Sequence, residues 1–260
     1  MPAPRPVRVA SAGVPVLLLA LALTACAADD APVDKSPKPV AASPAAGATP
    51  SPTPTPTPAP TPTERPLPEQ QLHAGPVGDG VPATVSGSGS AVVGYTRQGE
   101  TALVVGIDCT ACAGEVVVTA PDRGEPWGQG PAPYSGSYLL DIFRDTAPEQ
   151  AVVVHAEGPW TLTLESWNDL ELVTGPQQGT GSTVLFLGDT AGRLEVSYTP
   201  AGPEDSFHGR AYSAVDVDAS GNPATVLFGD SAPFADTYEI AMPGVLAIMT
   251  NGAWTVTPVP

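Results

Sequence analysis

Basic residues are scarce in this 260-residue chain, which holds 10 lysines and arginines against 27 aspartates and glutamates and carries a net charge of −17 at pH 7. From Ser86 onward, five arginines face 21 acidic residues. A surface of this sign repels phosphate backbones, so we expect no nucleic-acid partner. The simplest role of the acidity is to keep an extracellular surface soluble, and binding of calcium or of basic partners stays open.

Histidine and cysteine are also scarce, with three of each. His73, His155 and His208 are scattered along the sequence, and their spacing matches neither a metal site nor a catalytic triad. We therefore expect no metal, no cofactor and no enzymatic activity. The sequence gives no indication of an oligomeric state.

Apolar runs long enough for a membrane span are missing, since the run at Val14–Leu23 is far shorter than the roughly 20 residues that a spanning helix needs. Two arginines precede this run, and the residues LTAC at Leu23–Cys26 follow it, which is typical of a secretory signal. The pattern resembles the lipobox of bacterial lipoproteins. That resemblance implies a signal peptide over 1–25, a Cys26 carrying acyl chains such as palmitate, and a lipid-anchored protein on the extracellular face of the cell membrane. An ordinary secretory peptide with an incidental cysteine is the alternative.

Proline, by contrast, is abundant, and Ala31–Pro66 is dominated by alternating proline and threonine. Proline lacks a backbone donor and fixes φ, so this tract is incompatible with helix or sheet. We expect residues 26–81 to be a disordered, extended linker, in which about 36 residues at about 3.1 Å each would reach about 110 Å. Glycosylation of its threonines stays open.

The remainder of the chain shows no convincing 3.6-residue apolar period, which argues against helices. Short β-branched segments recur instead, bounded by glycine, proline, aspartate or asparagine. We predict an all-β fold of two tandem small β-sandwich modules, jelly-roll-like, at residues 82–173 and 174–260. In the second module we expect four separate strands at Thr183–Gly188, Arg193–Tyr198, Asp236–Met242 and Val245–Thr250.

Four pairs of similar segments, in the same order, support a duplication. The pairs are Gly87–Ser90 with Gly179–Ser182, Thr101–Asp108 with Arg193–Pro200, Pro121–Pro126 with Asp218–Pro223, and Gly158–Thr163 with Gly252–Thr257. We expect the length differences between the copies to fall in loops. The second copy would gain residues at Gly202–Gly209, and the first around Phe143–Gln150.

The repeated Trp-Thr-x-Thr phrase predicts a closing strand in each copy. Alternation places Trp160 and Leu162 on one face, and likewise Trp254 and Val256. We therefore expect both tryptophans in the cores, with a ligand platform as the alternative. Trp167 is out of phase with Trp160, and we expect it to pack near the connection between the modules.

Trp127 and Tyr134 are the candidate ligand contacts. They lie in a glycine- and proline-rich segment, EPWGQGPAPY, that has no counterpart in the second copy. Loops that present aromatic side chains are frequent binding sites. A loop tryptophan folded back over the sheet is the alternative.

Cys109 and Cys112 form a Cys-x-x-Cys pair flanked by strand-like residues and by Asp108 and Glu115. Acidic neighbours disfavour a reactive thiolate, and zinc would need two further ligands for which no suitable spacing exists. Outside the membrane, a structural disulfide across a hairpin turn is the prediction.

Two motifs suggest other functions. Phe228–Ser231, FGDS, resembles the nucleophile block of GDSL-type hydrolases, but the 29 residues after Ser231 contain no histidine. A hydrolase is therefore only a remote alternative. Asp216–Pro223 begins like a calcium loop, but Leu227 stands where a glutamate is needed, so we predict a hairpin turn.

A family resemblance completes the prediction. The Gly158–Leu164 phrase, the preceding apolar segment Ala151–Ala156 and the polar mid-module turns are similar to pre-peptidase C-terminal-type modules of exported bacterial proteins. The resemblance implies non-catalytic β-sandwiches that assist binding or display, and it assigns no functional residue. We expect an extracellular lipoprotein that presents binding modules to an envelope protein or glycan. An accessory or regulatory subunit of an exported enzyme or transporter is the alternative.

Overall fold

The computed structural model describes residues 65–99, 102–121, 123–140 and 147–260. Cys26, the signal sequence and the linker up to residue 64 lie outside these residues, so the predictions about them stay predictions. The predicted end of the linker at residue 81 was wrong, because Gln71–Val77 forms a strand whose Val77 is buried in the first core. The described residues form strands, with a single 3-10 turn, η1 (Trp167–Asp169), and no α-helix among them, which confirms the all-β prediction. Within these same ranges no helix has the length and apolarity to cross a membrane.

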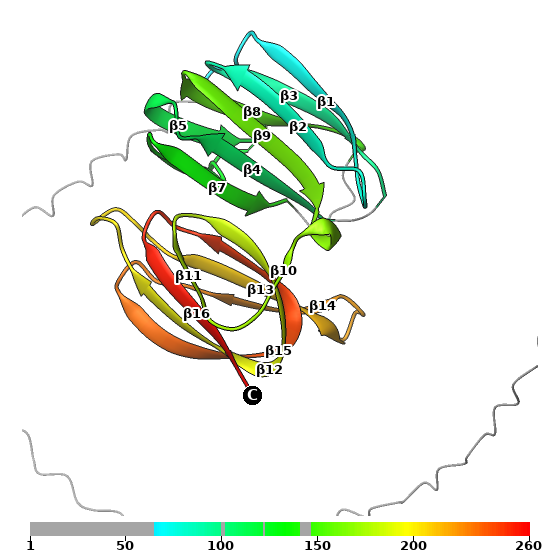
Figure 1. Ribbon diagram of the computed structural model, residues 1–260, viewed down its shortest axis with the longest axis vertical. Helices are drawn as coiled ribbons and strands as arrows, with labels where there is room; N and C mark the ends of the chain where they lie inside the picture. The colour runs from blue at the N-terminus through cyan, green and yellow to red at the C-terminus, as the bar shows by residue number, and fades with distance from the viewer. Residues whose placement is uncertain (1–64, 100–101, 122, 141–146) are drawn as a thin grey trace, which may run out of the picture. The chain divides into compact units, whose positions relative to one another are not determined.

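The first sandwich, residues 71–166, consists of two sheets (Figure 1). One sheet has the order β2-β9-β4-β7 and the other the order β1-β3-β8-β5-β6. Apart from β1, which runs parallel to β3, all neighbours are antiparallel, and strands β2 to β9 follow the order of an eight-stranded jelly roll. The strands are β1 (Gln71–Val77), β2 (Ala83–Ser88), β3 (Ala91–Arg97), β4 (Leu103–Cys109), β5 (Ala113–Thr119), β6 (Gly128–Pro131), β7 (Tyr134–Leu139), β8 (Glu149–Glu157) and β9 (Pro159–Ser166).

In the second sandwich, residues 172–259, the strands of both layers are connected into one continuous hydrogen-bonded sheet. Its order is β11-β16-β12-β15-β13-β14, and β10 pairs with β12. Its strands are β10 (Leu172–Val173), β11 (Gln177–Thr180), β12 (Thr183–Thr199), β13 (His208–Val217), β14 (Pro223–Phe228), β15 (Phe234–Met249) and β16 (Ala253–Val259). Figure 1 shows β12 and β15 as long, strongly curved strands. Each of them contributes to both layers, because the pairing of β12 with β15 shifts register between Leu187 and Arg193.

The prediction of four separate strands was therefore wrong, since β12 and β15 each merge two of them. Gly188 and the Pro243-Gly244 pair suggest turns in the sequence, but irregular pairing carries the strands through these positions. Gly244 is required at this point because a Cβ there would lie 2.0 Å from the carbonyl oxygen of Tyr212.

The same pairing pattern occurs in both sandwiches. The second half of β12 and the first half of β15 join β11 and β16 in the order of β2-β9-β4-β7. The other halves join β13 and β14 in the order of β3-β8-β5-β6, and β10 lies parallel to β12 as β1 does to β3. The two sandwiches are thus two versions of one topology.

One of the four sequence pairs is misaligned. Asp108 pairs with Thr161, and Ser197 pairs with Thr255, so Asp108 corresponds to Ser197 rather than to Pro200. A shift by an odd number of residues, here three, would place inward-facing side chains on the outer face of the strand. The similarity of Thr101–Asp108 to Arg193–Pro200 is therefore one of composition and not of structural position.

The tryptophan phrases occupy equivalent places and confirm the core prediction. Trp160 is 3 % exposed and its Nε1 donates to the carbonyl oxygen of Gly89 at 2.7 Å, while Trp254 is 6 % exposed and donates to Gly181 at 2.9 Å. A Cβ on Gly87 would lie 2.3 Å from the Trp160 ring. Glycine at this position, and at Gly179 under Trp254, leaves space for the indole.

A small apolar cluster joins the sandwiches. It comprises Val104, Val184, Val245 and Ala247, with Leu139, Trp167, Leu170 and Phe186 packed against them. Trp167 meets the Tyr212 ring edge-on at 6.1 Å between centroids, and β7 adds a hydrogen bond from the Val184 amide to the Ser137 hydroxyl at 2.9 Å. The described strands belong to one compact unit, Pro60–Pro260.

Candidate functional site

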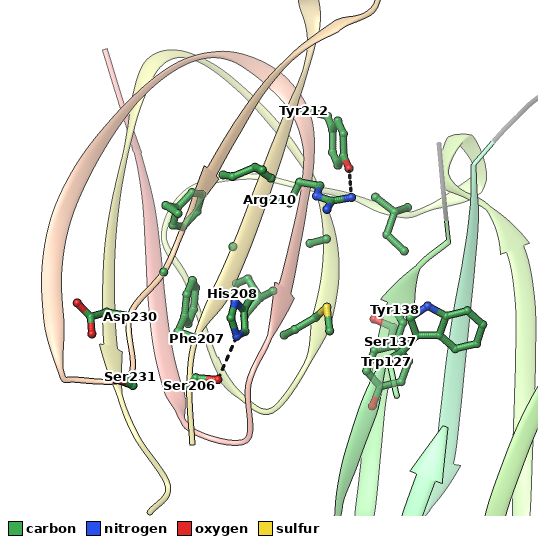
Figure 2. A pocket seen from close by; sticks show the side chains of 18 of the residues that line it. Trp127, Ser137, Tyr138, Ser206, Phe207, His208, Arg210, Tyr212, Asp230 and Ser231 are labelled. Carbon is green, nitrogen blue, oxygen red and sulfur yellow. Dashed lines mark hydrogen bonds between the residues drawn. The ribbon is translucent and has the colours of Figure 1, made fainter. Parts of the chain in front are cut away.

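A cleft of about 870 Å³ lies where β7 of the first sandwich meets β13 and β15 of the second (Figure 2). The segment around Trp127 and the turn after β14 complete its walls. Its volume falls in the range of about 300 to 1,000 Å³ that is usual for small-molecule sites. The cleft is therefore the candidate binding site.

A fixed aromatic floor supports the cleft. Phe207 and Phe228 are stacked at 5.9 Å between centroids, and both are buried. Their backbones lie so close that a Cβ on Gly229 would lie 2.0 Å from the carbonyl oxygen of Phe207. The amide of Phe207 donates to the carbonyl of Asp230 at 2.9 Å, which ties β13 to the turn after β14. The floor is therefore formed before any ligand arrives.

Two arginines line the cleft, one from each sandwich, and an aromatic side chain positions each of them. Arg210 donates from Nη1 to the hydroxyl of Tyr212 at 3.0 Å (Figure 2). Arg123 places its guanidinium carbon 5.6 Å from the ring centre of Trp127, which is a cation–π contact. These two guanidiniums provide directed donors at the wall of the cleft.

Hydroxyl and imidazole groups add neutral polar contacts. The Ser206 hydroxyl and His208 Nε2 lie 3.1 Å apart, and Ser231, next to Asp230 in the turn after β14, also lines the cleft (Figure 2). A serine–imidazole hydrogen bond is one part of a nucleophilic site. Within the described residues, no carboxylate is hydrogen-bonded to the second ring nitrogen of His208, so the pair lacks the orienting group of a triad.

The charge of the cleft is opposite to that of the protein surface around it. Arg123 and Arg210 are two of the five arginines after Ser86, whereas Asp230 is the single acidic residue among the described residues that line the cleft. The Asp230 carboxylate accepts a hydrogen bond from the amide of Ala232 at 2.9 Å. The described lining of the cleft thus carries a net positive charge, unlike the chain as a whole.

Of the two candidate ligand contacts, Trp127 lines the cleft and Tyr134 does not. Trp127 is half-buried against the first core and lies under Arg123, so it supports an arginine rather than offering a bare stacking face. Tyr134 is buried and shares a hydrogen bond with the hydroxyl of Tyr138. Burial raises the pKa of both phenols, and the neighbouring Tyr134 raises that of Tyr138 further, so both stay protonated.

The cysteine pair and the calcium-like segment have structural roles. Cys109 and Cys112 form a disulfide across the turn between β4 and β5, with their Cα atoms 5.1 Å apart. Asp216–Pro223 forms the predicted hairpin turn between β13 and β14, and Asp218 Oδ1 accepts from the amides of Ser220 and Asn222 at 2.8 and 3.0 Å. Among the described residues, no group of three or more histidine, cysteine, aspartate or glutamate side chains is placed to hold a metal ion.

Sequence reasoning missed Arg123, Arg210 and the Ser206–His208 pair. A signal for Arg210 was present, because residues two apart on a strand share a face and Arg210 precedes Tyr212 by two. Arg123 gave no comparable signal, since its partner Trp127 lies four residues away in an irregular segment. The convergence of the two arginines depends on how the sandwiches pack, which no local pattern encodes.

Comparisons with known proteins add little to this geometry. No protein-family model matches the chain, and no curated protein matches it. A solved structure that aligns with it is a regulatory subunit of a cAMP-independent protein kinase A from Trypanosoma cruzi bound to guanosine, at 7 % identity and a TM-score of 0.21, covering 68 % of this chain and 72 % of that one. A likeness of this size supports no conclusion about fold or function.

Proposed function

We propose that this protein is a membrane-anchored extracellular lipoprotein that displays two non-catalytic β-sandwiches and binds an envelope ligand in the cleft between them. The cleft is the observation that carries the proposal. Its floor is fixed by buried phenylalanines and close backbone contacts, and its walls present polar groups from both sandwiches. A preformed concave site with a few directed polar groups is the usual form of a ligand site.

The lipid anchor and the linker give the proposal its place in the cell. Both rest on the sequence, through the lipobox resemblance at Cys26 and the proline-rich tract at Ala31–Pro66. An anchored stalk of about 110 Å would hold the sandwiches away from the membrane, where envelope polymers are accessible. A binding module without enzymatic activity fits this position.

The test is retention of the full chain, kept in a nonionic detergent, on an insoluble envelope fraction. Ser231 is exposed at the wall of the cleft, so Ser231→Trp fills the site without a change of charge. We expect this variant to lose most of its retention. Ser220→Trp is the matched control, because Ser220 is equally exposed but lies in the β13–β14 turn outside the cleft lining.

Retention that is the same for the wild type and both variants would place binding elsewhere. Absence of retention for all three proteins would contradict the binding function itself. Retention through a single envelope protein would instead favour an accessory or regulatory subunit.

A further inference from the structure

We propose that the cleft binds an anionic glycan, a saccharide whose rings carry carboxylate or phosphate groups, through Arg123 and Arg210. This inference rests on the proposed binding function and specifies its ligand. Guanidinium groups recognise carboxylate and phosphate oxygens by paired, charge-assisted hydrogen bonds. A pair of positioned arginines is therefore the feature that selects the ligand class.

Arg210 is held in place on one side of the cleft. Its hydrogen bond to Tyr212 uses one of the five N–H donors of a guanidinium. Tyr212 is itself 3 % exposed and packed edge-on against Trp167. The acceptor that orients Arg210 is therefore rigid, and less side-chain entropy is lost when the remaining donors bind a ligand.

Arg123 is held differently on the other side. Its guanidinium carbon lies 5.6 Å from the centre of the Trp127 ring, and this cation–π contact does not consume any of its N–H donors. The donors of Arg123 therefore stay available to a ligand. Trp127, which the sequence suggested as a ligand contact, contributes to the site by holding this arginine.

Among the described residues, no salt bridge or hydrogen bond to a carboxylate is found for Arg123 or Arg210. A salt bridge joins Arg65 and Glu115, and neither residue lines the cleft. In a domain with 21 acidic residues after Ser86, a lining that contains two arginines and, among the described residues, a single aspartate forms a local positive site. Such a site favours an anion as ligand.

The rest of the lining favours a sugar over an acidic peptide. Hydroxyl and imidazole groups of Ser206, His208 and Ser231 match the dense hydroxyls of a saccharide, and the exposed side chain of Leu227 in the lining offers apolar surface to a sugar ring. The net charge of −17 of the whole chain also disfavours polyanions of high charge density. A saccharide with no more than one charge per ring and several hydroxyls on each ring meets both conditions.

The inference is tested by calorimetric titration of the full chain, in nonionic detergent, with four probes. They are a hexagalacturonate for carboxylate, a phosphorylated maltohexaose for phosphate, neutral maltohexaose, and a hexaglutamate peptide. We expect at least one of the two anionic, hydroxyl-bearing probes to bind, and to bind more weakly as salt is raised. The stronger of the two identifies the anionic group.

Variants locate the binding. We expect Arg210→Gln and Arg123→Gln each to weaken binding by about tenfold or more, the effect of losing a charged hydrogen bond. Arg210→Lys keeps the charge but not the paired donors, so its affinity should lie between those of the wild type and Arg210→Gln. Arg193→Gln is the matched control, since Arg193 is exposed and donates to the carbonyl of Pro260 at 2.8 Å outside the cleft lining.

The outcomes separate the inference from the function on which it rests. Maltohexaose binding as tightly as the charged probes, unchanged in the arginine variants but lost in Ser231→Trp, would keep the cleft as a binding site and overturn the anionic ligand. Preference for hexaglutamate would overturn the glycan. No binding of any probe, with envelope retention still lost in Ser231→Trp, would also overturn the inference while leaving the proposed function intact.

Discussion

The two sandwiches share their strand order and differ clearly in one connection, which links β4 to β5 in the first and β12 to β13 in the second; we call this connection the corner. In the first, β4 ends at Cys109 and β5 begins at Ala113, so a short turn connects the strands. In the second, the equivalent strands β12 and β13 are separated by residues 200–207. The predicted gain of residues at Gly202–Gly209 is confirmed at this corner. The longer connection has to be fixed to the sandwich by other bonds than the shorter one.

Each corner is closed by its own chemistry. The first uses the disulfide between Cys109 and Cys112. The second uses the carboxylate of Asp205, which accepts from the amide of Ala201 at 2.9 Å and the amide of Asn251 at 3.0 Å, with Thr250 Oγ1 at 3.2 Å. The comparison teaches that the topology tolerates either clamp, because the core strands alone define it.

The longer corner also carries the cleft. Ser206, Phe207 and His208 come at its end, where the chain enters β13, and all three line the site. The short disulfide corner of the first sandwich contributes no residue to the lining. The longer loop of the second sandwich therefore supplies part of the wall of the cleft, and loops on rigid frameworks commonly provide such surfaces.

We expect the largest loss of stability on substitution of the two core tryptophans, which occupy equivalent positions in the two sandwiches. Trp160→Ala and Trp254→Ala each remove a buried indole and its hydrogen bond to a glycine carbonyl. We expect each to destabilise its own sandwich by about 3 to 5 kcal/mol, as for other large-to-small core substitutions. Urea unfolding followed by fluorescence and circular dichroism measures this.

Trp127→Ala is the control for this pair. Trp127 is half-buried at the wall of the cleft, and its loss should cost about 1 kcal/mol. If Trp254→Ala unfolded like the wild type while Trp160→Ala did not, the structural equivalence of the two closing strands would be contradicted.

The sequence predicted these strands because their side chains alternate strictly. Trp160, Leu162 and Leu164 point inward along β9, with the intervening residues more exposed, and the period-two pattern needs no knowledge of the partner strands. It failed at β12 and β15, where glycine and proline in the middle of a strand mark an irregularity rather than an end. At Gly188 and at Pro243-Gly244 the local sequence favours a turn, whereas hydrogen bonds to neighbouring strands favour a continuous strand. The structure shows the continuous strand, with irregular pairing at these positions.

The site was less predictable than the fold. Arg123 and Arg210 come from different sandwiches, and only the packing around Val104 and Ala247 brings their walls together. Tyr134 appeared equivalent to Trp127 in the sequence, yet it points into the core on β7. Contacts between segments about 90 residues apart carry no periodic signal.

The next largest loss of stability is expected on substitution of Asp205 in the connection between β12 and β13. Asp205→Ala removes several hydrogen bonds to a carboxylate, and we expect a loss of about 2 to 3 kcal/mol at neutral pH. Partial burial raises the pKa of Asp205, but hydrogen bonds from Ala201, Asn251 and Thr250 outweigh it and hold the pKa below its ordinary value. The carboxylate therefore stabilises the fold above its unfolded pKa of about 3.9, and this stabilisation is lost as pH falls through the lower folded value.

Thermal unfolding at several pH values checks this. The difference between wild type and Asp205→Ala should be constant above about pH 5 and should shrink in more acidic solution. Asp230→Ala is a suitable control, because Asp230 accepts one amide at the same end of the sandwich. A gap between wild type and Asp205→Ala that persisted unchanged at pH 2 would show that the charge has no part in closing the loop.

The smallest effect is expected at the short corner. The bond between Cys109 and Cys112 closes a loop with a sequence separation of 3, so its removal should cost about 1 to 2 kcal/mol, less than the roughly 3 kcal/mol of a 15-residue loop. Cys109→Ser with Cys112→Ser should therefore fold, melt at a lower temperature and keep its ligand binding, because neither residue lines the cleft. Thiol alkylation followed by mass spectrometry should find both cysteines oxidised in the native protein. Two free thiols there, or loss of binding in the double variant, would make this pair a functional element and end its equivalence to the Asp205 clamp.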